Sequence, residues 1–194
     1  MGVYLKPIDE DNFLDVFNLK LREGQDNYVS HPIRSLAQAY VYRTQCQPFG
    51  IYADERVVGY VMVIYDYDIP EYDIWHMMID SSQQGKGYGR AALALVLDYI
   101  GQKPFGDSNR VALTCNRDNA TALALYRSMG FELTGNTDGD EVELAFMLQE
   151  ASDFFLSLRQ SLSIGHRPML FLYPFRELSA YREQEKAPHT PKIR

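Results

Sequence analysis

The residues with the clearest chemical potential lie in a glycine-rich turn between a predicted strand and a predicted helix. Residues 74–90 read Ile-Trp-His-Met-Met-Ile-Asp-Ser-Ser-Gln-Gln-Gly-Lys-Gly-Tyr-Gly-Arg, with three glycines at alternate positions. Glycine allows positive φ and lets a ligand come close to the backbone. A helix start offers unpaired N–H groups and the positive end of the helix dipole, and Lys86 and Arg90 add two cations. The sequence therefore predicts a pyrophosphate site at this turn.

Two other interpretations of the turn compete with this one. The simplest is a glycine-rich connection without a ligand, although three alternate glycines before an Ala- and Leu-rich helix argue against it. Residues 87–92 also satisfy the G-x-G-x-x-A pattern of dinucleotide-binding folds. However, the loop before the glycines is too long for that fold, and Asp107 lies in a loop instead of at a strand end. Too few βα units follow to build such a sheet.

A second motif lies at residues 119–131, which read Asn-Ala-Thr-Ala-Leu-Ala-Leu-Tyr-Arg-Ser-Met-Gly-Phe. It matches the pattern N-x-x-A-x-x-L-Y-x-x-x-G-F, and residues 84–89 match the signature Q/R-x-x-G-x-G/A. By these two motifs the chain resembles the GNAT N-acetyltransferase superfamily over residues 3–149. The resemblance implies a GNAT-like fold, acetyl-CoA as the cofactor, and transfer of its acetyl group to an amine.

The resemblance also places the cofactor on particular residues. It implies that the pantetheine arm lies along the backbone of the strand before the turn, and that the pyrophosphate binds the backbone amides of the turn. It also places the side-chain amide of Asn119 on the cofactor arm, a role that is compatible with capping a helix. The cofactor-binding residues implied in this way are Met77, Met78, Ile79, Gln84, Gly85, Lys86, Gly87, Tyr88, Gly89, Arg90, Asn119 and Tyr126.

Tyr126 is the residue that the resemblance assigns as general acid, protonating the sulfur of the departing CoA. The competing interpretation is a core tyrosine, since Leu125 and Met129 flank it on a predicted helix. The general base is less evident, because Trp75 stands where relatives often place a carboxylate. His76 has a suitable ordinary pKa for a base, but strand neighbours face opposite sides, so it need not share the face of Trp75. A water chain to a more distant carboxylate is the alternative.

An acidic strip before the turn suggests the acceptor. Residues 66–80 hold five carboxylates and no Lys or Arg, with Tyr and Trp side chains interleaved. Such a strip suits a flexible polycation, although charge runs are often solvated loops. Scattered matches in residues 1–149 also resemble the bacterial spermine/spermidine (diamine) acetyltransferase branch, which implies a polyamine acceptor. The candidate substrate contacts, some in the loop between the first two helices, are Asp26, Tyr28, Glu71, Asp73 and Trp75.

These motifs must be held by an α/β fold with a mixed sheet. Hydrophobic spacing predicts elements in the order β-α-α-β-β-β-α-β-α-β-β, with helices covering the faces of the sheet. The resemblance implies that the central sheet is mostly antiparallel. The predicted strands cover residues 3–8, 49–53, 56–65, 74–80, 111–115, 131–134 and 142–148. The predicted helices begin after Asp9 and cover Ser35–Arg43, Tyr88–Ile100 and Asn119–Met129.

The chain divides into an acetyltransferase-like domain at residues 1–149 and an extension of unknown role at residues 150–194. The last residues, 187–194, are polar with two prolines, and we expect them to be disordered. Apolar positions in the extension, such as Phe154 and Phe171, must be covered by the first domain or by a dimer contact. Family members often form dimers, which implies a homodimer here.

Composition limits the classes of partner. The chain has 194 residues, of which 46% are hydrophobic, and a net charge of −7, which argues against a nucleic-acid binder and permits a cationic substrate. It has no apolar run of about 18 residues and no signal-peptide pattern, so we expect no membrane span. Cys46 and Cys115 lie far apart, and the histidines lack ligand-like spacing. We therefore expect a cytoplasmic protein without a metal site.

Other functions fit the same residues. The acceptor could be a protein N-terminus, a lysine or an aminoglycoside instead of a polyamine. A different class is a non-catalytic acyl-CoA sensor or interaction module, suggested by the missing strand carboxylate and the apolar positions of the extension. Tyr126→Phe discriminates between these classes, because a catalyst loses turnover while still binding the cofactor, and a sensor is indifferent.

Overall fold

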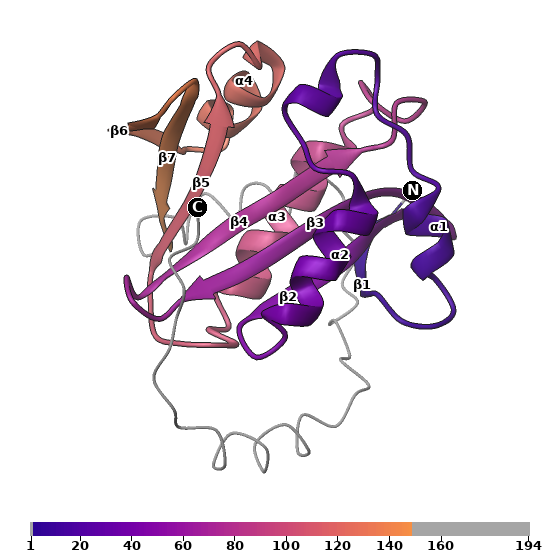
Figure 1. Ribbon diagram of the computed structural model, residues 1–194, viewed down its shortest axis with the longest axis horizontal. Coiled ribbons are helices and arrows are strands. Elements are labelled where there is room, and N and C mark those ends of the chain that lie inside the picture. Colours follow the sequence, from indigo (N-terminus) through magenta and orange to yellow (C-terminus); the bar gives the residue numbers. More distant parts are fainter. Residues whose placement is uncertain (1, 149–194) are drawn as a thin grey trace. The chain divides into compact units, whose positions relative to one another are not determined.

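The computed structural model describes residues 2–148 (Figure 1). Within them a seven-stranded sheet has the order β1-β2-β3-β4-β5-β7-β6, antiparallel throughout except for the parallel pair β4 and β5. The strands are β1 (Val3–Pro7), β2 (Cys46–Ala53), β3 (Arg56–Asp66), β4 (Glu71–Ile79), β5 (Arg110–Asn116), β6 (Glu132–Asp138) and β7 (Glu141–Met147). The helices are α1 (Phe13–Phe17), η1 (Gln25–Asn27), α2 (Pro32–Val41), α3 (Tyr88–Ile100) and α4 (Ala120–Ser128). The extension predicted at residues 150–194 lies outside the described residues.

Two apolar layers, one on each face of the sheet, hold these elements together. α3 lies behind the sheet in Figure 1, and its fully buried Leu93 and Leu97 belong to the larger layer. α1 and α2 lie in front of the sheet, where Val16 and Ala39 pack with Met62 of β3. Full burial of a Leu or Met side chain contributes about 1.5–3 kcal/mol. Both faces are therefore fixed independently of any ligand.

β4 and β5 stay together over a short stretch only. Their parallel pairing links Tyr72 to Val111 and Asp73 to Ala112, and no further pair joins them in the described part of the chain. Beyond Asp73 the two strands diverge, and α4 follows β5 on one side of the opening (Figure 1). An extended ligand can therefore enter the sheet between β4 and β5, and Asp73 marks the point at which the strands separate.

A β-bulge interrupts β4 within the predicted acceptor region. Met62 pairs with His76 and Val63 pairs with Ile74, so that Trp75 is an extra residue without a partner on β3. The rings of Trp75 and His76 stack, with centroids 5.1 Å apart and planes inclined by 21°. The alternation of strand neighbours, from which His76 was expected not to have to share the face of Trp75, is interrupted here by the bulge.

The element order agrees with the sequence prediction, and the differences lie at element ends. α1 is shorter than the helix predicted after Asp9, because the chain turns away after Phe17. The backbone N–H of Lys20 then donates to Oδ2 of Asp80 at 2.8 Å, which ties this segment to the loop after β4. α2 begins at Pro32, earlier than predicted, since proline suits the first helical position.

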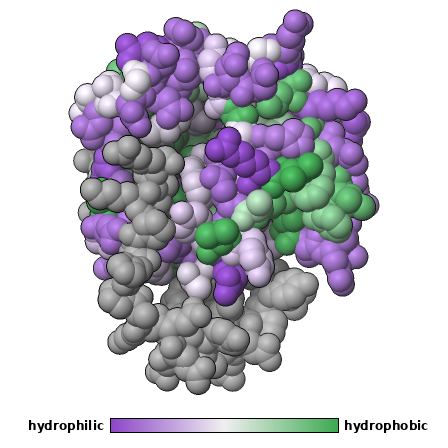
Figure 2. Space-filling view, viewed as in Figure 1, coloured by the Kyte–Doolittle hydropathy of each residue, from purple (hydrophilic) through white to green (hydrophobic). Residues whose placement is uncertain are grey.

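The surface of α1 and α2 is partly apolar. Figure 2 shows a hydrophobic area over these two helices among mostly hydrophilic surroundings. Leu14, Ile33 and Val41 of these helices are 59%, 51% and 67% exposed. Among residues 2–148, no helix has the length and apolar character needed to cross a membrane.

Candidate active site

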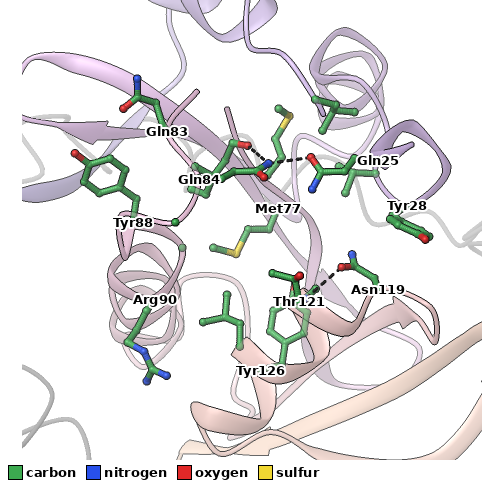
Figure 3. Close-up of a pocket in the computed structure, with 18 of the residues that line it drawn as sticks. Gln25, Tyr28, Met77, Gln83, Gln84, Tyr88, Arg90, Asn119, Thr121 and Tyr126 are labelled. Atoms are coloured by element: carbon green, nitrogen blue, oxygen red, sulfur yellow. Dashed lines mark hydrogen bonds between the residues drawn. The ribbon is translucent and has the colours of Figure 1, made fainter. Parts of the chain in front are cut away.

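A cavity of about 360 Å³ lies where β4, the glycine turn, α3 and α4 meet, and the segment between α1 and α2 forms its remaining wall (Figure 3). Of the predicted cofactor-binding residues, all but Lys86 line it. Of the predicted substrate contacts, Tyr28 lines it, whereas Asp26, Glu71, Asp73 and Trp75 do not. The structure therefore brings the two sequence motifs to one cavity, although they are about thirty residues apart.

The glycine turn has the backbone geometry that the sequence predicts. Gly85 has φ +79° and Gly87 has φ +83°, values that residues with a side chain rarely adopt. A Cβ atom added at either position would have no neighbour within 4 Å, so the backbone there is open to a ligand. Gly87 is also the N-cap of α3, and no side chain caps this helix start. Its first N–H groups are thus available to an anion, and the turn fits a pyrophosphate.

The two cationic side chains of the turn, Lys86 and Arg90, both donate hydrogen bonds to protein groups. Nζ of Lys86 donates to Oε1 of Gln83 at 2.8 Å, within the turn itself. The guanidinium of Arg90 donates to the hydroxyl and carbonyl oxygens of Ser128 and contacts the sulfur of Met129 at 3.2 Å. Arg90 therefore ties the start of α3 to the C-terminal end of α4, where a cation is favourable. Both cationic side chains are therefore engaged by protein groups.

α4 carries the two polar residues of the second motif. Oδ1 of Asn119 accepts a hydrogen bond from the N–H of Ala122 at 3.2 Å, which makes Asn119 the N-cap of α4. Tyr126 lies further along α4, and its side chain lines the cavity (Figure 3). Burial raises the pKa of Tyr126, and the nearby Cys115 and Asp73 raise it further. Its phenol therefore holds its proton firmly at neutral pH.

Asp73 is a half-buried carboxyl at the point where β4 and β5 separate. Burial raises the pKa of Asp73 to about 7, and the charges of Glu143, Asp66 and Glu141 raise it as well. Among the described residues no group donates a hydrogen bond to its carboxylate or pairs with it. A carboxyl with a pKa near 7 exchanges protons at neutral pH, as a general base must. The charge of Asp73 contributes to the raised pKa of Tyr126, so the two groups lie within electrostatic range of each other.

His76 lies in a different environment. Its Nε2 is 3.2 Å from Oε1 of Gln38 on α2, and its ring stacks on Trp75. Burial lowers the pKa of His76 to about 4, and the positive charge of Arg34 lowers it further. The imidazole is therefore neutral at pH 7 and binds a proton weakly. No three His, Cys, Asp or Glu side chains within residues 2–148 are grouped to hold a metal ion.

Glu71 is held in an ion-pair network. Arg110 of β5 bonds Glu71 of β4 through one nitrogen and Glu143 of β7 through another. Burial opposes ionisation of Glu143, but a hydrogen bond from Asn136, the hydrogen bond and charge of Arg110, and a hydrogen bond from Thr134 together lower its pKa. The Glu71 carboxylate is therefore already neutralised by protein, whereas Asp73, the other carboxylate of β4, has no such cationic partner among the described residues.

Sequence reasoning missed Gln25. The Oε1 atom of Gln25 accepts a hydrogen bond from Nε2 of Gln84 at 2.8 Å and lines the cavity (Figure 3). A glutamine in an irregular segment carries no local signal of such a contact, since its partner is 59 residues away. Asp26 and Tyr28, which the sequence predicted as substrate contacts, follow Gln25 within η1 and at its C-cap.

The comparison with known proteins agrees with this geometry. Residues 13–131, more than half of the chain, match the acetyltransferase (GNAT) family. The chain belongs to this family, and it is an acetyl-CoA-dependent N-acetyltransferase.

Among relatives, spermine/spermidine N(1)-acetyltransferase of Bacillus subtilis (strain 168) is 25% identical over 151 residues, which cover 71% of this chain and 93% of that protein. Among solved structures, spermidine N-acetyltransferase from Vibrio cholerae in complex with CoA and spermine has a TM-score of 0.62 at 18% identity, covering 80% of this chain and 98% of that one. An aminoglycoside acetyltransferase, AAC(6')-Ib, in complex with coenzyme A has a TM-score of 0.64 at 16% identity, covering 78% and 98%. At these identities the structural likenesses establish the fold.

The cavity fits the cofactor of the family, acetyl-CoA. The positive-φ glycines and the uncapped start of α3 offer backbone N–H groups to its pyrophosphate, and the opening between β4 and β5 offers a strand edge to its extended arm. When bound, acetyl-CoA supplies an activated acetyl group.

Proposed function

We propose that this protein acetylates a primary amine of a polyamine such as spermine or spermidine. The observation that carries the proposal is the group of carboxylates whose charges act on Asp73, namely Asp66, Glu141 and Glu143. Carboxylates from β3, β4 and β7 thus surround the point where the sheet opens, and a cationic acceptor is attracted to them. The relative of 25% identity whose name specifies spermine and spermidine supports the same substrate class.

In the proposed mechanism Asp73 is the general base. An ammonium ion has no lone pair, so the acceptor must lose a proton before it attacks the acetyl carbonyl. The Asp73 carboxylate takes this proton, because its pKa of about 7 lies close to neutral pH. We prefer Asp73 to His76, whose pKa of about 4 makes it a weak proton acceptor. Trp75 and Tyr42, with ring centroids 5.5 Å apart, offer an aromatic surface to the rest of the acceptor.

Tyr126 is the general acid in the same proposal. As the nitrogen bonds to the acetyl carbon, the bond from that carbon to sulfur breaks and negative charge develops on sulfur. The Tyr126 hydroxyl, which keeps its proton because burial raises its pKa, donates that proton to sulfur. The second proton, which the nitrogen loses as the amide forms, restores the Tyr126 phenol. Asp26 and Tyr28, in the segment between α1 and α2, are proposed to contact the acceptor, and Tyr28 lines the cavity.

The direct test is a turnover assay against a panel of amines. Release of CoA from acetyl-CoA is followed with spermine, spermidine, putrescine, an aminoglycoside and a lysine peptide as acceptors. The proposal expects spermine or spermidine to be the preferred acceptor by kcat/KM. Preference for the aminoglycoside or the peptide would replace the polyamine with that acceptor. If none of these amines is acetylated while acetyl-CoA still raises the melting temperature, the result would favour an acyl-CoA sensor.

A further inference from the structure

The side chain of Gln84 is used for a contact within the protein. Its Nε2 donates to the carbonyl oxygen of Ile79 at 3.0 Å and to Oε1 of Gln25 at 2.8 Å (Figure 3). A primary amide has two N–H groups, so both donors of Gln84 are committed. One reaches back to the end of β4, and the other reaches across the cavity rim to the segment between α1 and α2. Gln84 therefore joins the glycine turn to the opposite wall.

Gln25 organises that opposite wall. Its Oε1 also accepts the N–H of Arg22 at 3.0 Å, and its carbonyl oxygen accepts the N–H groups of Tyr28 and Val29 at 3.0 and 3.2 Å. Hydrogen bonds to Gln25 thus hold together the turn of residues 22–29. It carries Asp26 and Tyr28, which the proposed function assigns to the acceptor.

Few apolar contacts hold the middle of this wall in place. Leu21 before it and Val29 at its end pack against the apolar layer under α1 and α2, but residues 22–28 between them contain no buried side chain. The position of residues 22–28 between these two anchors therefore depends largely on hydrogen bonds, including those to the loop after β4. These are the Gln84–Gln25 bond and, further back, the bonds of the Lys20 backbone to Asp80 and Ser81.

We propose that the hydrogen bond between Gln84 and Gln25 couples the two ligand sites of this enzyme. A cofactor pyrophosphate bound at residues 85–90 restricts the motion of the turn. Through its bond to Gln25, Gln84 then restricts the motion of residues 22–29. The amine therefore binds to a wall that is already in place. Gln84 is in this account a positioning residue. The inference rests on the proposed acceptor side of the cavity, and by linkage the amine strengthens cofactor binding by the same factor.

Binding of spermidine with and without saturating CoA measures the coupling. CoA lacks the acetyl group, so the ternary complex does not react. In the wild-type protein CoA is expected to lower the Kd of spermidine by about fivefold, the effect of roughly one hydrogen bond. Gln84→Met and Gln25→Met are each expected to remove most of this factor, and the double variant is expected to be no worse than either single one. Because Gln84 also lines the cofactor cavity, turnover is compared at saturating acetyl-CoA, where the KM for spermidine should rise by a larger factor than kcat falls, whereas a merely damaged fold would mainly lower kcat.

Gln83→Met is the matched control. Gln83 lies in the same turn and lines the same cavity, but among residues 2–148 its side chain bonds Ser82 and Lys86 of the turn and no group of the opposite wall. This variant is expected to retain the wild-type coupling factor. Wild-type coupling in Gln84→Met, or its equal loss in Gln83→Met, would overturn the inference.

Hydrogen exchange separates this inference from the choice of acceptor. CoA alone is expected to slow amide exchange in residues 22–29 and 85–90 of the wild-type protein. In Gln84→Met the protection of residues 85–90 should remain, since backbone groups bind there, and that of residues 22–29 should disappear. If spermidine fails to bind but this pattern holds, the polyamine proposal is wrong and the coupling stands. If CoA leaves residues 22–29 unprotected in the wild-type protein, the coupling is wrong.

Discussion

At the scale of residues, the proposed site combines two ionisable groups with opposite roles, the carboxyl of Asp73 and the phenol of Tyr126. Burial shifts both Asp73 and Tyr126 toward their protonated forms, and the charge of Asp73 raises the pKa of Tyr126 further. For the carboxyl this shift brings the pKa to about 7, where a base is most effective at neutral pH. For the phenol the shift keeps a proton available for the leaving sulfur. Desolvation thus suits both a base on β4, Asp73, and an acid on α4, Tyr126.

Tyr126→Phe is expected to lower kcat by about 100-fold or more, the usual contribution of a general acid, and to leave the Kd of acetyl-CoA within about twofold. Stopped-assay turnover together with calorimetric titration of acetyl-CoA measures both quantities. Tyr4→Phe is the control, because Tyr4 is 40% exposed on β1 and stacks on Tyr52 away from the cavity. Wild-type turnover in Tyr126→Phe across pH would show that another group or water supplies the proton.

At the scale of elements, the turn between β4 and α3 presents backbone to the cofactor. Gly87→Ala is expected to raise the KM for acetyl-CoA by about tenfold and to lower the melting temperature, because alanine is strained at φ +83° by roughly 1–2 kcal/mol. Steady-state kinetics and thermal unfolding check the two effects. Gly101→Ala at the other end of α3 is the control, since Gly101 has an ordinary helical φ of −58°. Equal effects of the two substitutions would mean that the turn has no special role.

The sequence predicts elements and motifs well where the signal is local. The alternate glycines predict the turn, and the spacing of residues 119–131 predicts α4 with Asn119 as its cap, as the structure has it. The bulge at Trp75 could not be predicted, because it depends on the register of β4 against β3. The bond of Gln84 to Gln25 was missed for the same reason, since its partners are far apart in the chain. The choice between Asp73 and His76 likewise needed burial, which the sequence leaves open.

At the scale of the whole molecule, the charge of the chain favours cationic partners. The net charge is −7, and residues 150–194 hold seven Lys or Arg against five Asp or Glu, so the acidic excess lies in residues 1–149. Long-range attraction of a polycation is screened by salt over a distance of about 10 Å at 0.1 M. The KM for spermine is therefore expected to rise with ionic strength more steeply than the KM for putrescine, which carries fewer charges. Parallel slopes for the two amines would contradict an electrostatic acceptor site.

The pH dependence of kcat/KM for spermidine tests the central claim most directly, because it asks whether Asp73 is the base. Only the deprotonated carboxylate can accept the proton, so activity should fall as pH falls through about 7, the pKa to which burial raises Asp73. Asp73→Asn should lose activity by about 100-fold or more and lose this inflection, whereas His76→Gln should keep both. An inflection that survives in Asp73→Asn and disappears in His76→Gln would contradict the account and transfer the role of base to His76.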